Sequence, residues 1–237
     1  MRLDKYIGHT TLLSRAESKK IIKKGVLVNG NVVKTPDFKI DEFNDEVIVN
    51  EKKLIYQKYI YIMMNKPKGV VSATEDNLHK TVLDLIDPLY FKKGVFPVGR
   101  LDIDTHGLLL LTNDGELAHR LLSPKKHVTK IYQARVDGVM TLEDAATFER
   151  GIVLSDGTEC MPAQLDILRT SQDESVVQIH IKEGKFHQVK RMVKACGKNV
   201  VDLQRLTMGT LKLDERLALG ESRPLTEEER QSLEIND

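Results

Sequence analysis

Three acidic residues, a histidine and an arginine flank a run of four leucines in the middle of this 237-residue chain. Residues 99–115 read GRLDIDTHGLLLLTNDG. The leucines predict a buried strand. Core packing does not explain the ionisable side chains on both sides, because a buried charge is costly unless it is paired or used. This segment is therefore the first candidate for an active site.

The acids in this segment admit three interpretations. Asp102 and Asp104 share one face if the segment is extended, and such a pair can serve acid–base or nucleophilic catalysis. Together with His106 they alternate in the sequence and could converge on a metal ion. Alternatively the segment is a polar loop, in which Asp114 caps the helix that follows. The spacing alone does not choose among these uses of Asp102.

Composition indicates a globular protein of one large or two smaller domains. Hydrophobic residues make up 41% of the chain, enough for a packed core, and no apolar run approaches the roughly 20 residues of a membrane span. Cys160 and Cys196 form neither a disulfide framework nor a CxxC pair, which favours reduced thiols. We expect a cytoplasmic monomer that does not associate with membranes.

Residues 1–58 are predicted to form a small module of helix and strands. Ser14 can cap a helix that runs to about Lys24 and stops at Gly25. The apolar side of this helix is expected to consist of Ala16, Ile21 and Ile22. Short strands are predicted at residues 26–28, 32–33 and 47–49, with a hairpin turn at residues 29–30.

The same helix carries an excess of positive charge. Five basic residues and one acid fall between residues 15 and 24, although the net charge of the chain is only +1. Such a face is a candidate contact for a polyanion, and its alternative is a solvated helix face. The basic residues are Arg15, Lys19, Lys20, Lys23 and Lys24.

Polar residues 51–58 are the predicted linker to a second domain at residues 59–237. There, strands and helices alternate irregularly, which favours an α+β fold over a parallel βαβ arrangement. Residues 65–69 are predicted to form a turn with two lysines. Strands are predicted at residues 59–64, 70–71, 108–111, 128–136 and 175–182, and helices after Asp114, around residues 189–196 and after Thr226.

The N-terminal module resembles the S4 RNA-binding domain. The resemblance rests on RLDKYI at residues 2–7, LSRA at residues 13–16, and Ile22, Gly25, Val26, Val28, Asn29 and Gly30. It implies binding to structured RNA through the helix face and the adjacent hairpin. The phosphate contacts that it implies are Arg2, Lys5, Ser14, Arg15, Lys19 and Lys20.

Residues 99–109 resemble the catalytic motif of pseudouridine synthases, and four further blocks follow the order of that family. They are NKPKG at residues 65–69, KIY at 130–132, EGKFHQVKRM at 183–192 and RPLT at 223–226. The longer match is to the branch that modifies uridine 516 of 16S ribosomal RNA in the small subunit. The resemblance therefore implies a catalytic domain with a mixed, largely antiparallel sheet, which isomerises uridine without a metal or cofactor.

The same resemblance implies roles for individual residues. Asp102 is the catalytic residue, and Tyr132 stacks on uracil and can transfer a proton at C5. Lys190, rather than Arg191, pairs with Asp102. Leu203 packs the target base. Arg100 is expected to occupy the place that the uridine leaves in the RNA, with a salt bridge to a neighbouring acid as the alternative.

Three other functions stay open at the level of the sequence. One is a pseudouridine synthase that acts on large-subunit ribosomal RNA. Another is a non-catalytic assembly factor that binds ribosomal RNA through the S4 module. The last is a metal-dependent nuclease that uses Asp102, Asp104 and His106.

Overall fold

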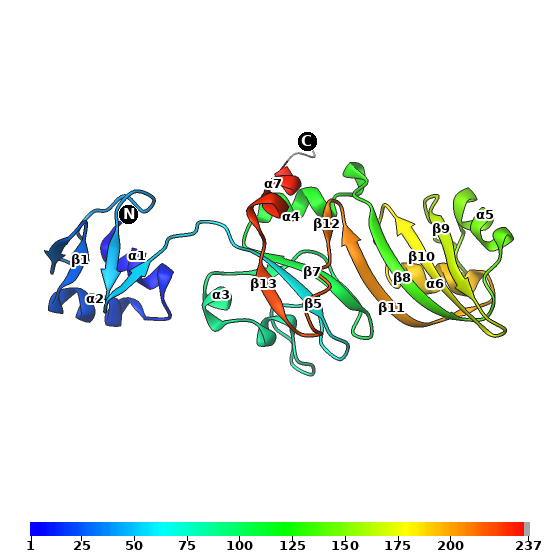
Figure 1. Ribbon diagram of the computed structural model, residues 1–237, viewed down its shortest axis with the longest axis horizontal. Helices are drawn as coiled ribbons and strands as arrows, with labels where there is room; N and C mark the ends of the chain where they lie inside the picture. Colours follow the sequence, from blue (N-terminus) through cyan, green and yellow to red (C-terminus); the bar gives the residue numbers. More distant parts are fainter. Residues whose placement is uncertain (235–237) are drawn as a thin grey trace. The chain divides into compact units, whose positions relative to one another are not determined.

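This computed structural model describes residues 1–234, and their contacts divide the chain into two units (Figure 1). The first unit comprises Met1–Ile60 and the segment Asp87–Val95. The second comprises Tyr61–Ile86 and the chain from Phe96 onward. The break after Ile60 lies two residues beyond the expected end of the first domain.

The first unit packs two helices on a four-stranded antiparallel sheet of order β2-β1-β3-β4. Its core joins Leu3, Tyr6 and Ile7 of the first helix to Ile22 of the second and to valines of the sheet. The elements are α1 (Leu3–Thr10), α2 (Arg15–Lys24), β1 (Val26–Val28), β2 (Asn31–Val33), β3 (Val47–Val49) and β4 (Lys52–Leu54).

The predicted cap of α2 is confirmed. The Ser14 hydroxyl accepts a hydrogen bond from the Glu17 amide at 3.2 Å, and the Ser14 amide donates to the Glu17 carboxylate at 2.7 Å. The predicted apolar side is partly wrong, because Ala16 is exposed and Ser18 is buried with Ile22. Ser18 fits there because its hydroxyl donates to the Ser14 carbonyl at 2.9 Å, which satisfies the buried polar group.

The predicted linker at residues 51–58 is wrong in its first half. Lys52–Leu54 form β4, which pairs with β3, and Leu54 is buried in the core of the first unit. Its two lysines made the segment read as polar, and both are exposed because β4 is an edge strand of the sheet. The Tyr6 hydroxyl also donates to the Leu54 carbonyl at 3.1 Å, so this segment belongs to the module.

The second unit is built on a nine-stranded mixed sheet, which confirms the predicted α+β fold. Its main path runs β13-β5-β7-β11-β8-β10-β9, with β12 beside β11 and β6 beside β7. Among the described strand pairs, β7 and β11 are parallel and the others antiparallel. Figure 1 shows the long curved strands β8, β10 and β11 side by side. The strands are β5 (Tyr61–Lys66), β6 (Phe96–Pro97), β7 (His106–Thr112), β8 (Lys130–Asp137), β9 (Gln164–Thr170), β10 (Glu174–Ile181), β11 (Asn199–Met208), β12 (Leu211–Lys212) and β13 (Ser222–Pro224).

Two helices of the second unit begin at the caps that the sequence predicted. Asp114 accepts a hydrogen bond from the Leu117 amide at 3.0 Å, and Thr226 exchanges hydrogen bonds with Glu229. The helix predicted around residues 189–196 is α6, which buries Val189, Met192 and Val193. The α-helices that follow β5 in the chain are α3 (Pro88–Lys92), α4 (Gly115–Leu122), α5 (Leu142–Arg150), α6 (Gln188–Ala195) and α7 (Glu227–Glu234).

The predicted turn at residues 65–69 is wrong at its start. Strand β5 continues through Asn65 and Lys66, both of which are buried. The predicted strand at residues 70–71 is also wrong, because Val71 makes only an isolated bridge to Thr81. Two polar residues before a proline favoured a turn, but β5 pairs with β7 along its whole length and extends through them.

Strands β7 and β11 approach each other unusually closely at Gly107. A Cβ atom at this position would lie 2.3 Å from the Arg205 carbonyl oxygen and 2.8 Å from its nitrogen, and the residue has φ +102°. Any other residue would clash with backbone and adopt a strained conformation. Gly107 therefore permits the parallel pairing that places the start of β7 beside the middle of β11.

Replacing Gly107 by alanine should destabilise the protein strongly, because backbone atoms must move apart. We expect a loss on the order of 3 kcal/mol and a fall of roughly 6–12 °C in the thermal midpoint measured by circular dichroism. Gly115→Ala is the matched control, since a Cβ there meets nothing within 4 Å and Gly115 lies in helix α4. Equal midpoints for the two variants would contradict the close approach.

Candidate active site

The segment before β7 is a turn rather than an extended strand. The Thr105 amide donates to the Asp102 carbonyl at 3.1 Å, which closes a tight turn over residues 102–105. Asp102 and Asp104 would share one face only in an extended segment, and this segment is not extended. The turn nevertheless brings both carboxylates to the same partner, as the contacts of Lys190 show.

Lys66, at the end of β5, holds this turn through hydrogen bonds to its backbone. Its ammonium is fully buried and donates to the carbonyls of Pro67 at 3.0 Å, Asp102 at 3.1 Å and Thr105 at 2.9 Å. Burial lowers the pKa of Lys66 to about 8, against the opposing effect of the carboxylates of Asp102 and Asp104. The burial of Lys66 was not predicted, because its place beside Pro67 favoured an exposed turn.

Two further contacts hold the same loop. The Ser72 hydroxyl lies 3.0 Å from the Leu101 amide and 3.1 Å from its carbonyl, and so bonds both sides of that residue. The Gly69 amide donates to the Ile103 carbonyl at 2.8 Å. The backbone of the loop is thus held at residues 101, 102, 103 and 105 by the end of β5 and the segment that follows it.

Lys190, on the first turn of α6, contacts both carboxylates of the loop. Its ammonium lies 2.8 Å from Asp102 Oδ2 and 2.5 Å from Asp104 Oδ1. Burial lowers the pKa of Lys190, but hydrogen bonds and attraction from the two aspartates outweigh it and raise the pKa above its ordinary value. Desolvation raises the pKa of Asp104, but the hydrogen bond to Lys190 and the attraction of its charge, together with smaller effects, outweigh it and lower the pKa below its ordinary value.

Arg191 does not compete for this position. It pairs with Asp156 at 2.5 Å and donates to the Phe186 carbonyl at 3.3 Å. Of the two basic neighbours that the sequence offered, Lys190 is therefore the partner of Asp102. A lysine presents a point charge rather than the two-pronged guanidinium, and here that charge is shared between two carboxylates.

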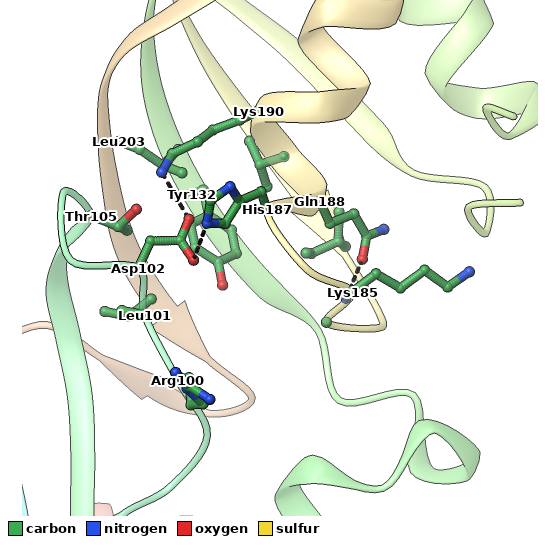
Figure 2. A pocket seen from close by; sticks show the side chains of 13 residues that line it. Arg100, Leu101, Asp102, Thr105, Tyr132, Lys185, His187, Gln188, Lys190 and Leu203 are labelled. Atoms are coloured by element: carbon green, nitrogen blue, oxygen red, sulfur yellow. Dashed lines mark hydrogen bonds and ion pairs between the residues drawn. The ribbon is translucent and has the colours of Figure 1, made fainter. Parts of the chain in front are cut away.

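His187 faces the second oxygen of Asp102, a contact that the sequence analysis did not foresee. Its Nε2 lies 3.5 Å from Asp102 Oδ1, and its ring stacks on Phe186 with centroids 3.8 Å apart. The residue precedes α6 with φ +47°, a left-handed conformation. Figure 2 shows the Asp102 carboxylate directed toward both Lys190 and His187.

A buried pair of side chains shapes the loop before α6. The Gln188 amide group donates to Glu183 at 2.7 Å and accepts from the Lys185 amide at 2.9 Å. Glu183 also accepts from the Met161 amide at 2.8 Å. These bonds fix the approach of α6 and hence the places of His187 and Lys190.

Tyr132 of β8 and Leu203 of β11 complete the site. Both are buried, and both line a cavity of about 70 Å³ with Asp102, Arg100 and Lys190. The five residues that the resemblance assigned to the reaction therefore surround one space (Figure 2). A wider hollow of about 630 Å³ adjoins it and shares Arg100, Asp102, Tyr132 and His187. The Asp102 side chain is 27% exposed, so a substrate can reach it.

Arg100 is exposed and makes no ion pair or hydrogen bond with another side chain in the described part of the chain. The alternative of a salt bridge to a neighbouring acid is therefore wrong. Arg100 lines both the cavity and the wider hollow. A cation at this place can meet an anionic polymer that enters the site.

The structure does not bring Asp102, Asp104 and His106 together as metal ligands. His106 Nε2 lies 3.1 Å from Asp202, which also pairs with Lys68, while both aspartates face Lys190. Over residues 1–234 no group of three His, Cys, Asp or Glu side chains could hold a metal ion. This arrangement does not provide the ligand set that the nuclease hypothesis required.

Of the residues expected to contact phosphates, all in the first unit, some have side chains that bond to other groups of the protein and others have exposed side chains. Arg2 is paired with buried Asp4 at 2.9 Å, and Ser14 is occupied as the cap of α2. Arg15 lies 3.8 Å from Asp4 and is mostly exposed. The side chains that remain exposed on this unit include those of Lys5, Lys19 and Lys20.

Together, the site offers a fixed carboxylate in a partly apolar cavity. Asp102 can act as a nucleophile or a base toward a bound group. The Tyr132 ring supplies a flat surface for a planar ligand and a hydroxyl for proton transfer.

No helix in residues 1–234 has the length and apolar character to span a bilayer.

The chain resembles known proteins along nearly its whole length. It is 47% identical over 230 residues to the RNA pseudouridine synthase YtzG of Bacillus subtilis, covering 97% of this chain and 96% of that protein. It is 40% identical over 234 residues to the ribosomal small subunit pseudouridine synthase A of Salmonella typhimurium, covering 97% and 98%. A crystal structure of a pseudouridylate synthase superimposes with a TM-score of 0.67 at 39% identity, covering 98% and 99%.

Family models agree with these relatives. The S4 domain model matches residues 1–47, and a model described as RNA pseudouridylate synthase matches residues 60–195. The second match contains β5, the loop of Asp102, β8 and α6, and with them all the described site residues except Leu203 of β11. The chain therefore belongs to the RNA pseudouridylate synthase family and carries an S4 domain at its N-terminus.

Proposed function

We propose that this enzyme isomerises a single uridine of small-subunit ribosomal RNA, at the position numbered 516 in 16S RNA. Relatives named ribosomal small subunit pseudouridine synthase A match the chain from end to end, at 39–40% identity. The observation that carries the proposed chemistry is the Asp102 carboxylate, held by Lys190 at 2.8 Å beside Tyr132 and Leu203.

The reaction breaks the N1–C1′ bond of uridine, turns the uracil and joins C5 to C1′. The proton on C5 is lost and N1 gains one, so the product is an isomer. Asp102 acts either as a nucleophile at C1′ or as a base that starts elimination to a glycal. Lys190 and His187 fix its two oxygens, which orients the carboxylate before the RNA arrives.

Tyr132 and Leu203 are proposed to hold the uracil. A buried aromatic ring stacks on a planar base, and an apolar side chain covers the opposite surface. The Tyr132 hydroxyl is the proposed group for proton transfer at C5. Since both residues come from strands of the same sheet, the ring and the leucine keep a fixed separation while the uracil turns.

Arg100 is proposed to compensate for extrusion of the uridine from the RNA. Removing a base from its stack costs a few kcal/mol, and a group that fills the vacated place reduces that cost. The free guanidinium at the mouth of the hollow supports this role. Asp104 and His106 are proposed as supporting residues, through Lys190 and Asp202 respectively.

The S4 module, residues 1–58, is proposed to dock the catalytic domain, residues 59–237, on folded RNA. Its exposed lysines contact phosphates without reading sequence, while Arg2 and Ser14 act through Asp4 and the helix cap. We propose that the enzyme works as a monomer in the cytoplasm.

Asp102→Asn should abolish the reaction because an amide is neither a nucleophile nor a base of comparable strength. With small-subunit ribosomal RNA that carries tritium at uracil C5, the wild-type protein should release one tritium and form one pseudouridine per RNA. The variant should release less than about a thousandth of that rate.

Asp104→Asn is the matched control, because Asp104 shares Lys190 but lies 65% exposed. It should keep activity within about tenfold of wild type. Turnover by Asp102→Asn at the wild-type rate would refute the role of Asp102. Pseudouridine formed only in large-subunit RNA would refute the proposed substrate, and no pseudouridine in either RNA would favour an assembly factor.

Neutralising the exposed lysines of α2 should weaken RNA binding most at low salt. The double variant Lys19→Gln/Lys20→Gln should lower the slope of log Kd against log salt by about 1–2. With fewer lysines in contact with phosphates, RNA binding releases fewer counterions. Filter binding between 50 mM and 300 mM salt measures this slope. Lys52→Gln/Lys53→Gln on β4 is the control, with two exposed lysines in the same unit. Identical slopes for the two variants would refute the specific role of α2.

A further inference from the structure

The hydroxyl of Thr105 lacks a hydrogen-bond partner although it is buried. Thr105 is 2% exposed, and its Oγ1 meets no donor or acceptor within the described residues. Leaving a buried hydroxyl unpaired costs about 1–3 kcal/mol. Thr105 lines the cavity of Asp102, Tyr132 and Leu203, the space in which the substrate is proposed to bind.

Other buried threonines of the second unit are satisfied. The Thr81 hydroxyl donates to Asp84 at 3.0 Å, and the Thr112 hydroxyl accepts from the Asp114 amide at 3.0 Å. Both are as deeply buried as Thr105. The orphaned hydroxyl is therefore a feature of the active-site loop and not of buried threonines in this fold.

The backbone of Thr105 is fixed to that of Asp102. Lys66 donates to both carbonyls, and the Thr105 amide donates to the Asp102 carbonyl. The hydroxyl therefore keeps its place relative to the carboxylate (Figure 2). A substrate group bound by Thr105 is positioned with respect to the atom on which Asp102 acts.

We propose that Thr105 Oγ1 binds the ribose 2′-hydroxyl of the target uridine, an inference that rests on the proposed function. In both routes Asp102 acts on the sugar, at C1′ or at the hydrogen of C2′, so the ribose lies against the loop. The 2′-hydroxyl is the sugar hydroxyl next to these atoms. The uracil lies instead between Tyr132 and Leu203, on strands β8 and β11.

The threonine hydroxyl and the ribose 2′-hydroxyl can form a hydrogen bond in either direction, because each can donate and accept. The bond satisfies Thr105 only when a ribonucleotide is bound. A deoxyribonucleotide leaves the threonine unpaired in a site from which water is excluded. Thr105 thus helps the enzyme to select RNA over DNA at the reacting residue.

The test uses synthetic RNA fragments that contain the uridine converted by the wild-type protein, with either a 2′-hydroxyl or a 2′-hydrogen there. Binding is measured in the Asp102→Asn background, so that no turnover occurs. The deoxy substitution should raise Kd about fivefold for Asp102→Asn. For Asp102→Asn/Thr105→Val it should raise Kd less than about twofold, because the partner has already been removed.

Activity and stability give separate readouts. Thr105→Val, which removes the hydroxyl at almost constant volume, should lower kcat/KM about tenfold, and Thr105→Ser should restore most of it. The thermal midpoint of Thr105→Val should equal or exceed that of wild type, because no bond within the protein is lost. Thr112→Val is the matched control and should lower the midpoint by a few degrees, because it orphans the Asp114 amide.

The inference is overturned if the deoxy substitution weakens both proteins equally, or if Thr105→Val keeps the wild-type kcat/KM. It is also overturned if Thr105→Val destabilises the protein as much as Thr112→Val, since the hydroxyl then has a partner within the protein. Failure of the wild-type protein to convert any uridine in ribosomal RNA would instead refute the proposed function, and this inference with it.

Discussion

The site depends on a buried ammonium beneath the loop that carries Asp102. Lys66 is fully enclosed, and its three hydrogen bonds all go to backbone carbonyls, two of them in the loop itself. A buried charge without such partners would cost several kcal/mol. The loop is therefore constrained to the conformation that satisfies this lysine, and in that conformation Asp102 and Thr105 both line the cavity.

The carboxylate is fixed from its other end by α6. Lys66 determines where the backbone of Asp102 lies, and Lys190 with His187 determines where its oxygens point. These two constraints come from opposite halves of the sheet. Gly107 makes them compatible, because it lets β7 approach β11 closely enough to bring the loop against the elements that follow β8 and β10.

The sequence identified the residues that line the cavity better than the residues that support them. Asp102, Lys190, Tyr132, Leu203 and Arg100 were all identified from motifs, and they line one cavity. Helix caps at Ser14, Asp114 and Thr226 were also predicted, because a cap depends on local chemistry within three or four residues. The roles of these active-site residues come from the family resemblance, since spacing alone left several uses of Asp102 open.

Features that depend on distant contacts were missed. The polar side chain of Lys66 favoured an exposed turn, but pairing of β5 with β7 makes Lys66 part of a buried strand. The polar segment of β4 favoured a linker, but pairing with β3 makes it part of the first sheet. Ala16 was expected on the apolar side of α2 but is exposed, whereas Ser18 is buried because its hydroxyl donates to the Ser14 carbonyl. The contact between His187 and Asp102 spans 85 positions and depends on a left-handed residue that no periodic pattern indicates.

The central claim is that the Lys66 ammonium positions Asp102 for reaction. Its most direct test is the single-turnover rate constant of tritium release for Lys66→Met, measured beside Lys68→Met, whose lysine lies across Pro67 and pairs with Asp202. The account predicts that Lys66→Met binds RNA with nearly wild-type Kd and reacts about a hundredfold more slowly, while Lys68→Met stays within about tenfold of wild type. A folded Lys66→Met protein that reacts at the wild-type rate would contradict it.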